Sequence, residues 1–251
     1  MSAQTIALRE LRGRRIITFD RPDAGNSFTA AQLEAIAEAL DDAERDQTCK
    51  MVIFEGRGGY FCRGLDFRDG LSQSSTRGSV RYLDLLERLR ALPLMVVAHV
   101  DGQVLAGGLG FVAASDYAIA SPRSTFGLPE ATWGLVPACV GLALERRIGR
   151  QWTLRLSLTT QTLDAATALG CALVDEVDEA PEQALRRLWL KIARIERGTI
   201  GRIKRYFDEL PAAPAARRAA ALAESDRQMS DPSVRAGISA WVEHGRFPWE
   251  R

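Results

Sequence analysis

A glycine pair, Gly107 and Gly108, stands between an apolar β-branched segment and an apolar run of helical character. The first turn of a helix has unpaired backbone N–H groups and carries the positive end of the helix dipole. Such a turn suits an oxygen that gains negative charge during a reaction, so the pair predicts an oxyanion hole. Glycines in this place can also serve close packing of a strand on a helix, and the pair alone leaves both interpretations open.

Glu130 is the second candidate for chemistry. It follows Pro129 and has Leu128, Trp133 and Leu135 as its near neighbours in the sequence. Apolar surroundings disfavour a charged carboxylate and raise its pKa toward the range in which a general base works. Taken alone, the residue could equally be an ordinary acid at a helix start. The order of strand, glycine turn, helix, strand and carboxylate favours the catalytic interpretation.

The ordered segments of the chain resemble the crotonase superfamily, which contains the enoyl-CoA hydratases and isomerases. The matching stretches cover nearly the whole chain: 16–22, 26–28, 61–67, 100–137, 163–175 and 240–243. The resemblance implies an α/β crotonase fold in which repeated ββα units form a spiral core with a C-terminal helical region. It implies a core over residues 1–195 and a helical trimerisation region over residues 196–251.

The resemblance also implies the site residues. In this superfamily two backbone amides hold the acyl thioester carbonyl, and the matching motifs place them on Leu65 and Gly107, with Glu130 as the acid-base residue. The residues expected to bind the thioester and its pantetheine arm are Arg63, Asp66 and Gly108.

Two other side chains are candidates for a pocket or acid-base role. Tyr82 precedes a helical apolar stripe, so it could hydrogen-bond the substrate or could belong to the core. His244 lies before Gly245 in the closing helix, so it could supply a proton near neutral pH or could be a surface histidine at a helix end.

The acid-base residues around the substrate decide the reaction. Family hydratases that add water carry a second glutamate near the start of the helix after the glycine pair, and here that position is Gly110. The chain resembles the crotonase-like dehydratases of polyketide β-branching, which dehydrate a 3-hydroxy-3-methylglutaryl group on acyl carrier protein. The strings that carry this resemblance are 106–116, 133–140, 146–149, 158–161 and 247–250. It departs from that subgroup at Arg63, Leu65 and Pro129, where small residues and a serine are expected.

Dehydration of a 3-hydroxyacyl thioester is therefore the favoured reaction, and two alternatives stay open. One glutamate base also suffices for an isomerase that moves a double bond between the α,β and β,γ positions. A crotonase-like subunit that only binds is the second alternative, since a fold does not guarantee chemistry.

Strand and helix signals alternate along the first half of the chain. Strands are expected at residues 5–8, 15–19, 51–55, 94–100 and 117–120, with helices from residue 29 and around residues 82–89. Residues 68–80, rich in glycine and small polar residues, predict a loop over the acyl pocket. After residue 137 helices are expected at 140–148, 151–158, 164–169, 182–195, 199–210 and 215–229.

Composition limits the partners. A net charge of +1 and a charged content of 26% predict no nucleic-acid partner, and the absence of a long apolar run predicts a cytoplasmic protein without a membrane span. The four cysteines are scattered and there are only two histidines, so no metal site is expected. No cofactor is expected beyond a substrate carried as a pantetheine thioester on CoA or acyl carrier protein, and the family implies a homotrimer or hexamer.

Overall fold

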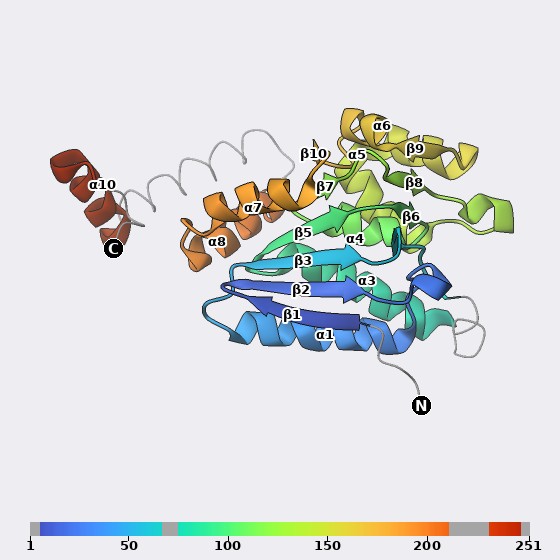
Figure 1. Cartoon of the computed structure of the whole chain (residues 1–251), viewed down its shortest axis with the longest axis horizontal. Coiled ribbons are helices and arrows are strands. Elements are labelled where there is room, and N and C mark those ends of the chain that lie inside the picture. The colour runs from blue at the N-terminus through green and yellow to red at the C-terminus, as the bar shows by residue number, and fades with distance from the viewer. Residues whose placement is uncertain (1–5, 67–74, 211–230, 247–251) are drawn as a thin grey trace.

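The first sheet of the computed structural model has six strands in the order β1-β2-β3-β5-β7-β10. The structure describes residues 6–66, 75–210 and 231–246 (Figure 1). The strands of this sheet are β1 (Ile6–Leu11), β2 (Arg14–Phe19), β3 (Met51–Gly56), β5 (Met95–Val100), β7 (Tyr117–Ala120) and β10 (Glu176–Val177). Only the first pair, the hairpin β1-β2, is antiparallel among them.

A second sheet continues the first beyond the carboxyl ends of its strands. Its order is β4-β6-β8-β9, with bounds Tyr60–Cys62, Gln103–Leu105, Thr125–Gly127 and Thr162–Asp164. Strand β3 leads into β4, β5 into β6 and β7 into β8, and a helix follows each of these pairs. The arrangement confirms the predicted crotonase fold of repeated ββα units.

Helices cover both faces of the large sheet. The described α-helices of the chain are α1 (Ala30–Arg45), α3 (Ser75–Ala91), α4 (Gly108–Ala114), α5 (Ala138–Thr159), α6 (Ala165–Gly170), α7 (Pro181–Ile192), α8 (Arg197–Asp208) and α10 (Pro232–His244). Apolar side chains of α1, α3 and α4 share one core with one face of the strands. Residues of α7 and α8 pack with the opposite face, where Ile53 and Val97 lie.

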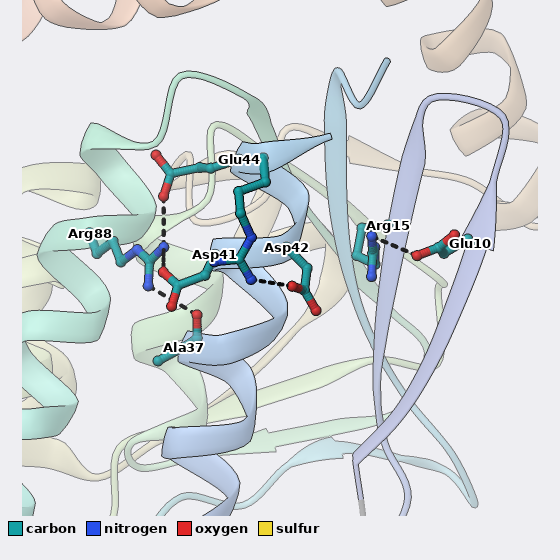
Figure 2. A network of polar contacts seen from close by, with 8 residues as sticks. Glu10, Arg15, Ala37, Asp41, Asp42, Glu44 and Arg88 are labelled. Atoms are coloured by element: carbon teal, nitrogen blue, oxygen red, sulfur yellow. Dashed lines mark hydrogen bonds and ion pairs between the residues drawn. The ribbon is translucent and has the colours of Figure 1, made fainter. Parts of the chain in front are cut away.

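Helix α3 is tied to α1 by Arg88, and Arg81 of α3 also pairs with Glu34 of α1. Figure 2 shows Arg88 of α3 donating to the backbone oxygen of Ala37 at 3.0 Å and pairing with Asp41 and Glu44 at 2.5 and 2.6 Å. Helix α1 itself begins with a capping box, in which Thr29 accepts from the Gln32 N–H and Gln32 accepts from the Thr29 N–H. The contacts of Arg88 hold α1 and α3 together.

The prediction of a loop over residues 68–80 is wrong for residues 75–80. Residues 75–80 form the first turns of α3, and residues 67–74 lie outside the described residues. The glycine and small polar residues suggested a loop, but the buried side chains Tyr82, Leu85 and Leu89 stabilise the helix by packing on the core. The expected helix at 215–229 also lies outside the described residues.

The two helices expected at 140–148 and 151–158 are one element with a break. Gly149 inside α5 has φ of 75° and ψ of 164°, a backbone conformation that glycine adopts without strain. The short helix α6 lies in the predicted helical range 164–169, and Asp164 is its N-cap, because the Asp164 carboxylate accepts from the Thr167 N–H at 2.8 Å.

Helix α8 is packed against the main body, although it follows the expected boundary at residue 196. Lys204 donates to the backbone oxygens of Leu89 and Leu94 and pairs with Asp116 at 2.6 Å. Helix α10 lies apart from the sheets in Figure 1. A trimerisation role for residues 196–251 stays a prediction.

In the described ranges, no helix is long and apolar enough to cross a membrane. Nor do the described side chains include a group of three or more His, Cys, Asp or Glu residues arranged to hold a metal ion.

Candidate active site

A cavity of about 650 Å³ lies beside the small sheet and brings most predicted site residues together. Its walls come from the segment before α1, the loop after β4, α3, the glycine turn, η2 (Glu130–Trp133) and the start of α5. The predicted residues that line it are Arg63, Leu65, Asp66, Tyr82, Gly107 and Glu130.

The Leu65 amide is free to bind a ligand because of its strand partner. Phe28 donates to the oxygen of Gly64 at 2.8 Å and accepts from the Asp66 N–H at 2.9 Å, which makes an isolated parallel bridge between Phe28 and Leu65. In such a bridge the N–H and C=O of the middle residue point away from the partner. The Leu65 N–H donates a hydrogen bond to no described residue.

The Gly107 amide lies next to the same loop. A Cβ on Gly64 would lie 2.9 Å from the Gly107 nitrogen, so the two loops approach backbone to backbone. Gly64 has φ of 88° and Ala106, just before Gly107, has φ of 50°. The Gly107 N–H likewise donates to no described residue. Two unpaired amides from adjacent loops are the arrangement that an oxyanion hole requires.

Glu130 is the first residue of η2 and is half-buried. Its Oε2 atom is buried and has no hydrogen-bond partner in the described part of the chain. Burial raises the pKa of this carboxyl above its ordinary value. A buried carboxylate oxygen without a partner costs folding free energy, and at the wall of a cavity this carboxylate is a candidate general base.

The expected thioester-binding residues have separate places. Asp66 is buried and pairs with Arg21 at 3.0 Å, which fixes the loop that carries Leu65. The Arg63 guanidinium lies 5.8 Å from the centre of the Tyr60 ring, at the cavity wall. Gly108 does not line the cavity; a Cβ there would lie 2.1 Å from the Cys62 oxygen, so this glycine permits close packing.

The structure separates His244 from the other site residues. Its side chain is 61% exposed at the end of α10, it neighbours the Glu243 carboxylate at 3.7 Å, and it does not line the cavity. Tyr82 meets both expectations, because it belongs to the core and also borders the cavity. It is 7% exposed within the core, and it lines the cavity.

Several basic residues of the helical half, which could otherwise attract an acidic carrier protein, are engaged within the chain. Arg147 pairs with Asp175, and Arg187 pairs with Glu176 and Asp178. Such pairs hold helices to the sheet and leave less charge for a partner.

Sequence reasoning missed the apolar wall of the cavity and its strained turn. Phe28, Val136 and Cys139 line the cavity, and no residue pattern indicates the positive φ of Ala106. Gly64 could have been found, because it stands in the same short motif as Leu65.

Comparison with known proteins identifies the family of the chain. The sequence pattern described as enoyl-CoA hydratase/isomerase matches residues 13–251. The chain belongs to this family. A crotonase-family chain with this site is an enzyme of the hydratase/isomerase kind, and its resemblance to the polyketide dehydratases extends over nearly its full length.

Two relatives of this hydratase/isomerase family member bear on its reaction. The chain is 35% identical to the bacillaene synthase dehydratase PksH of Bacillus subtilis, over 98% of the chain and 97% of the relative. It is 29% identical to the trans-2-decenoyl-[acyl-carrier-protein] isomerase of Streptococcus mutans, over 76% of each protein.

Solved structures of the family superpose along the whole chain. The putative polyketide biosynthesis enoyl-CoA hydratase of Bacillus subtilis has a TM-score of 0.78 at 35% identity and covers 98% of this chain and 100% of its own. An enoyl-CoA hydratase of Mycobacterium smegmatis has a TM-score of 0.90 at 26% identity, with 98% and 99% covered.

Proposed function

We propose that the enzyme dehydrates a 3-hydroxyacyl group of the 3-hydroxy-3-methylglutaryl type, carried as a pantetheine thioester on acyl carrier protein, in polyketide β-branching. The observation that supports this most is the unpartnered Oε2 atom of Glu130 at a cavity that also holds the free Leu65 and Gly107 amides. The relationship to a dehydratase of bacillaene synthase supports the reaction and the pathway class.

Glu130 removes the proton from C2 of the acyl group, and the C–H electron pair forms the thioester enolate. The Leu65 and Gly107 N–H groups stabilise its oxygen; in comparable holes the loss of one donor costs about 2.7 to 4 kcal/mol. The enolate then collapses to a C2–C3 double bond, and the C3–O bond breaks with its electron pair. The proton held by Glu130 passes to the leaving hydroxyl, so one carboxylate accounts for the loss of one water.

A double-bond isomerase is the second candidate. The same Glu130 could take a proton from C2 of a β,γ-unsaturated thioester and return it to C4, which gives the α,β isomer. The relationship to an isomerase that is named for an acyl-carrier-protein substrate favours this candidate. Either reaction uses a soluble carrier or CoA thioester, and the proposal places the enzyme in the cytoplasm, as a homotrimer or hexamer, without a further cofactor.

Intact-mass spectrometry of the carrier protein separates the two reactions. An acyl carrier protein loaded with 3-hydroxy-3-methylglutaryl is incubated with the enzyme, and a β,γ-unsaturated acyl carrier is incubated in parallel in deuterated water. Loss of one water from the first carrier is the expected result. No loss there, together with deuterium uptake and a shifted double bond in the second, would replace dehydration by isomerisation.

A further inference from the structure

Tyr82 reaches from α3 to the glycine turn of the candidate oxyanion hole. Its hydroxyl donates to the Gly107 oxygen at 2.5 Å. The ring stacks on Phe28 with centroids 5.2 Å apart and meets Phe111 edge to face at 6.0 Å. Two aromatic neighbours and a buried position leave the ring little freedom, so the hydroxyl is directed at one acceptor.

The Gly107 oxygen accepts a second hydrogen bond, from the Gly110 N–H at 3.1 Å. The carbonyl is therefore held from the helix and from α3 at once. The Gly107 carbonyl belongs to the peptide that joins Gly107 to Gly108, whereas its N–H belongs to the preceding peptide, whose Ala106 oxygen accepts from the Leu109 N–H at 2.9 Å. With both peptides held, the backbone at Gly107, with φ of −55° and ψ of −17°, keeps the amide directed at the cavity.

Gly110 leaves open the space that the Tyr82 hydroxyl occupies. A Cβ on Gly110 would lie 1.9 Å from the Tyr82 hydroxyl oxygen and 2.9 Å from Leu86 Cδ1. No side chain fits at residue 110 while Tyr82 keeps its hydrogen bond. The absence of a side chain at residue 110 and the position of Tyr82 depend on each other, because the phenol fills the space beside the first turn of α4.

The phenol stays protonated over the working range. Burial raises the pKa of Tyr82 well above its ordinary value, and the nearby Glu130 carboxylate adds to this shift. The helix that carries Tyr82 is anchored one and a half turns further on by the contacts of Arg88 with α1 (Figure 2). The donor is therefore neutral and held by a rigid support.

We propose that Tyr82 is a positioning residue, which orients the Gly107 amide through its carbonyl and excludes any side chain at residue 110 from the site. The proposal rests on the proposed function in one respect: the Gly107 N–H must bind the thioester oxygen. Tyr82 acts through Gly107 and does not itself exchange a proton with the substrate.

The direct test is the infrared carbonyl band of a bound thioester. Butyryl-pantetheine, labelled with ¹³C at the carbonyl, can be neither dehydrated nor isomerised, so its band reports the hole alone. Wild-type protein should lower the band frequency relative to water, and Tyr82→Phe should lose most of that shift while it keeps the stacking on Phe28. Tyr206→Phe, on α8 outside the cavity, is the matched control and should retain the full shift.

Kinetics give the second readout. Tyr82→Phe should lower kcat about tenfold with little change in KM, since an oriented hole stabilises the transition state more than the bound substrate. Gly110→Ala, which forces the hydroxyl away from Gly107, should lower kcat similarly. The double variant should show less than the product of the two effects, because both single changes break one contact.

The failures can be told apart. A Tyr82→Phe protein with the wild-type band shift and kcat would overturn the positioning role alone. A wild-type protein that binds butyryl-pantetheine without any shift would show that the two amides form no oxyanion hole, and this would overturn the proposed function as well.

Discussion

Glu130 is the residue on which the proposed chemistry depends. We predict that Glu130→Gln lowers turnover by about 100- to 10,000-fold, the usual contribution of a general base. The free energy of unfolding at pH 7 should stay equal or rise, because the raised folded-state pKa means that ionisation of this carboxyl opposes folding above its ordinary titration range. Turnover of carrier-bound substrate and urea unfolding measure the two effects. Wild-type turnover in the variant would remove Glu130 from the mechanism.

The pH dependence of the rate follows from the same burial. The base works only when deprotonated, so kcat/KM should fall as the pH falls through the pKa of Glu130. Because burial raises that pKa, the midpoint of the acidic limb should lie above the ordinary carboxyl value of 4.5. A profile of kcat/KM against pH checks this. A limb at or below 4.5 would mean that the free enzyme does not desolvate Glu130.

At the scale of elements, the contact between the glycine turn and β4 is a tight constraint. We predict that Gly108→Ala lowers the free energy of unfolding by about 1 to 3 kcal/mol and lowers activity, since its Cβ would meet the Cys62 backbone oxygen at 2.1 Å. Gly141→Ala in α5 meets no atom within 4 Å, so it should stabilise the protein by about 0.4 to 1 kcal/mol. Thermal or urea unfolding of both variants measures the difference, and equal effects would contradict the argument.

Lys204 attaches helix α8 to the main body together with Arg197, which donates to the oxygens of Glu44 and Cys49. Lys204→Met should lower the free energy of unfolding by about 2 to 3 kcal/mol, because the oxygens of Leu89 and Leu94 lose this donor and the Asp116 carboxylate loses its cation, although it keeps the Val96 N–H. The matched control is Lys191→Met on the exposed side of α7, with an expected change within about 0.5 kcal/mol. Urea unfolding of both variants is the measurement. Identical stabilities would show that the Lys204 contacts do not hold α8.

The elements were predictable from sequence where the pattern is local. The hairpin, the capped helix after Thr29, the strand before the glycine turn and the break at Gly149 all follow from alternation, caps and glycine. The start of α3 was not predictable, because its stability comes from packing of Tyr82 on distant residues. The match between Tyr82 and Gly110 lies beyond sequence reasoning for the same reason: a fit of side chain to space exists only in the folded chain.

At the scale of the whole molecule, apolar side chains remain on the surface of the single chain. Val136 is 82% exposed, Trp133 67% and Phe207 66%. Large exposed apolar side chains in several elements favour association with further subunits. The homotrimer therefore stays our prediction, with an expected solution mass of three times the 27.6 kDa chain or a multiple of that. Light scattering coupled to size-exclusion chromatography measures it, and the mass of one chain at micromolar concentration would contradict it.

The central claim is that Glu130 removes a proton from C2 of the thioester and that two backbone amides stabilise the resulting enolate, whichever reaction follows. Its most direct test is hydrogen exchange at C2 of a saturated acyl carrier thioester in deuterated water, followed by mass spectrometry of the released acyl group. We predict deuterium uptake at C2 with the wild-type enzyme and loss of that uptake in Glu130→Gln. Uptake at the same rate in both proteins, or none in the wild type while its substrate is still converted, would contradict the account.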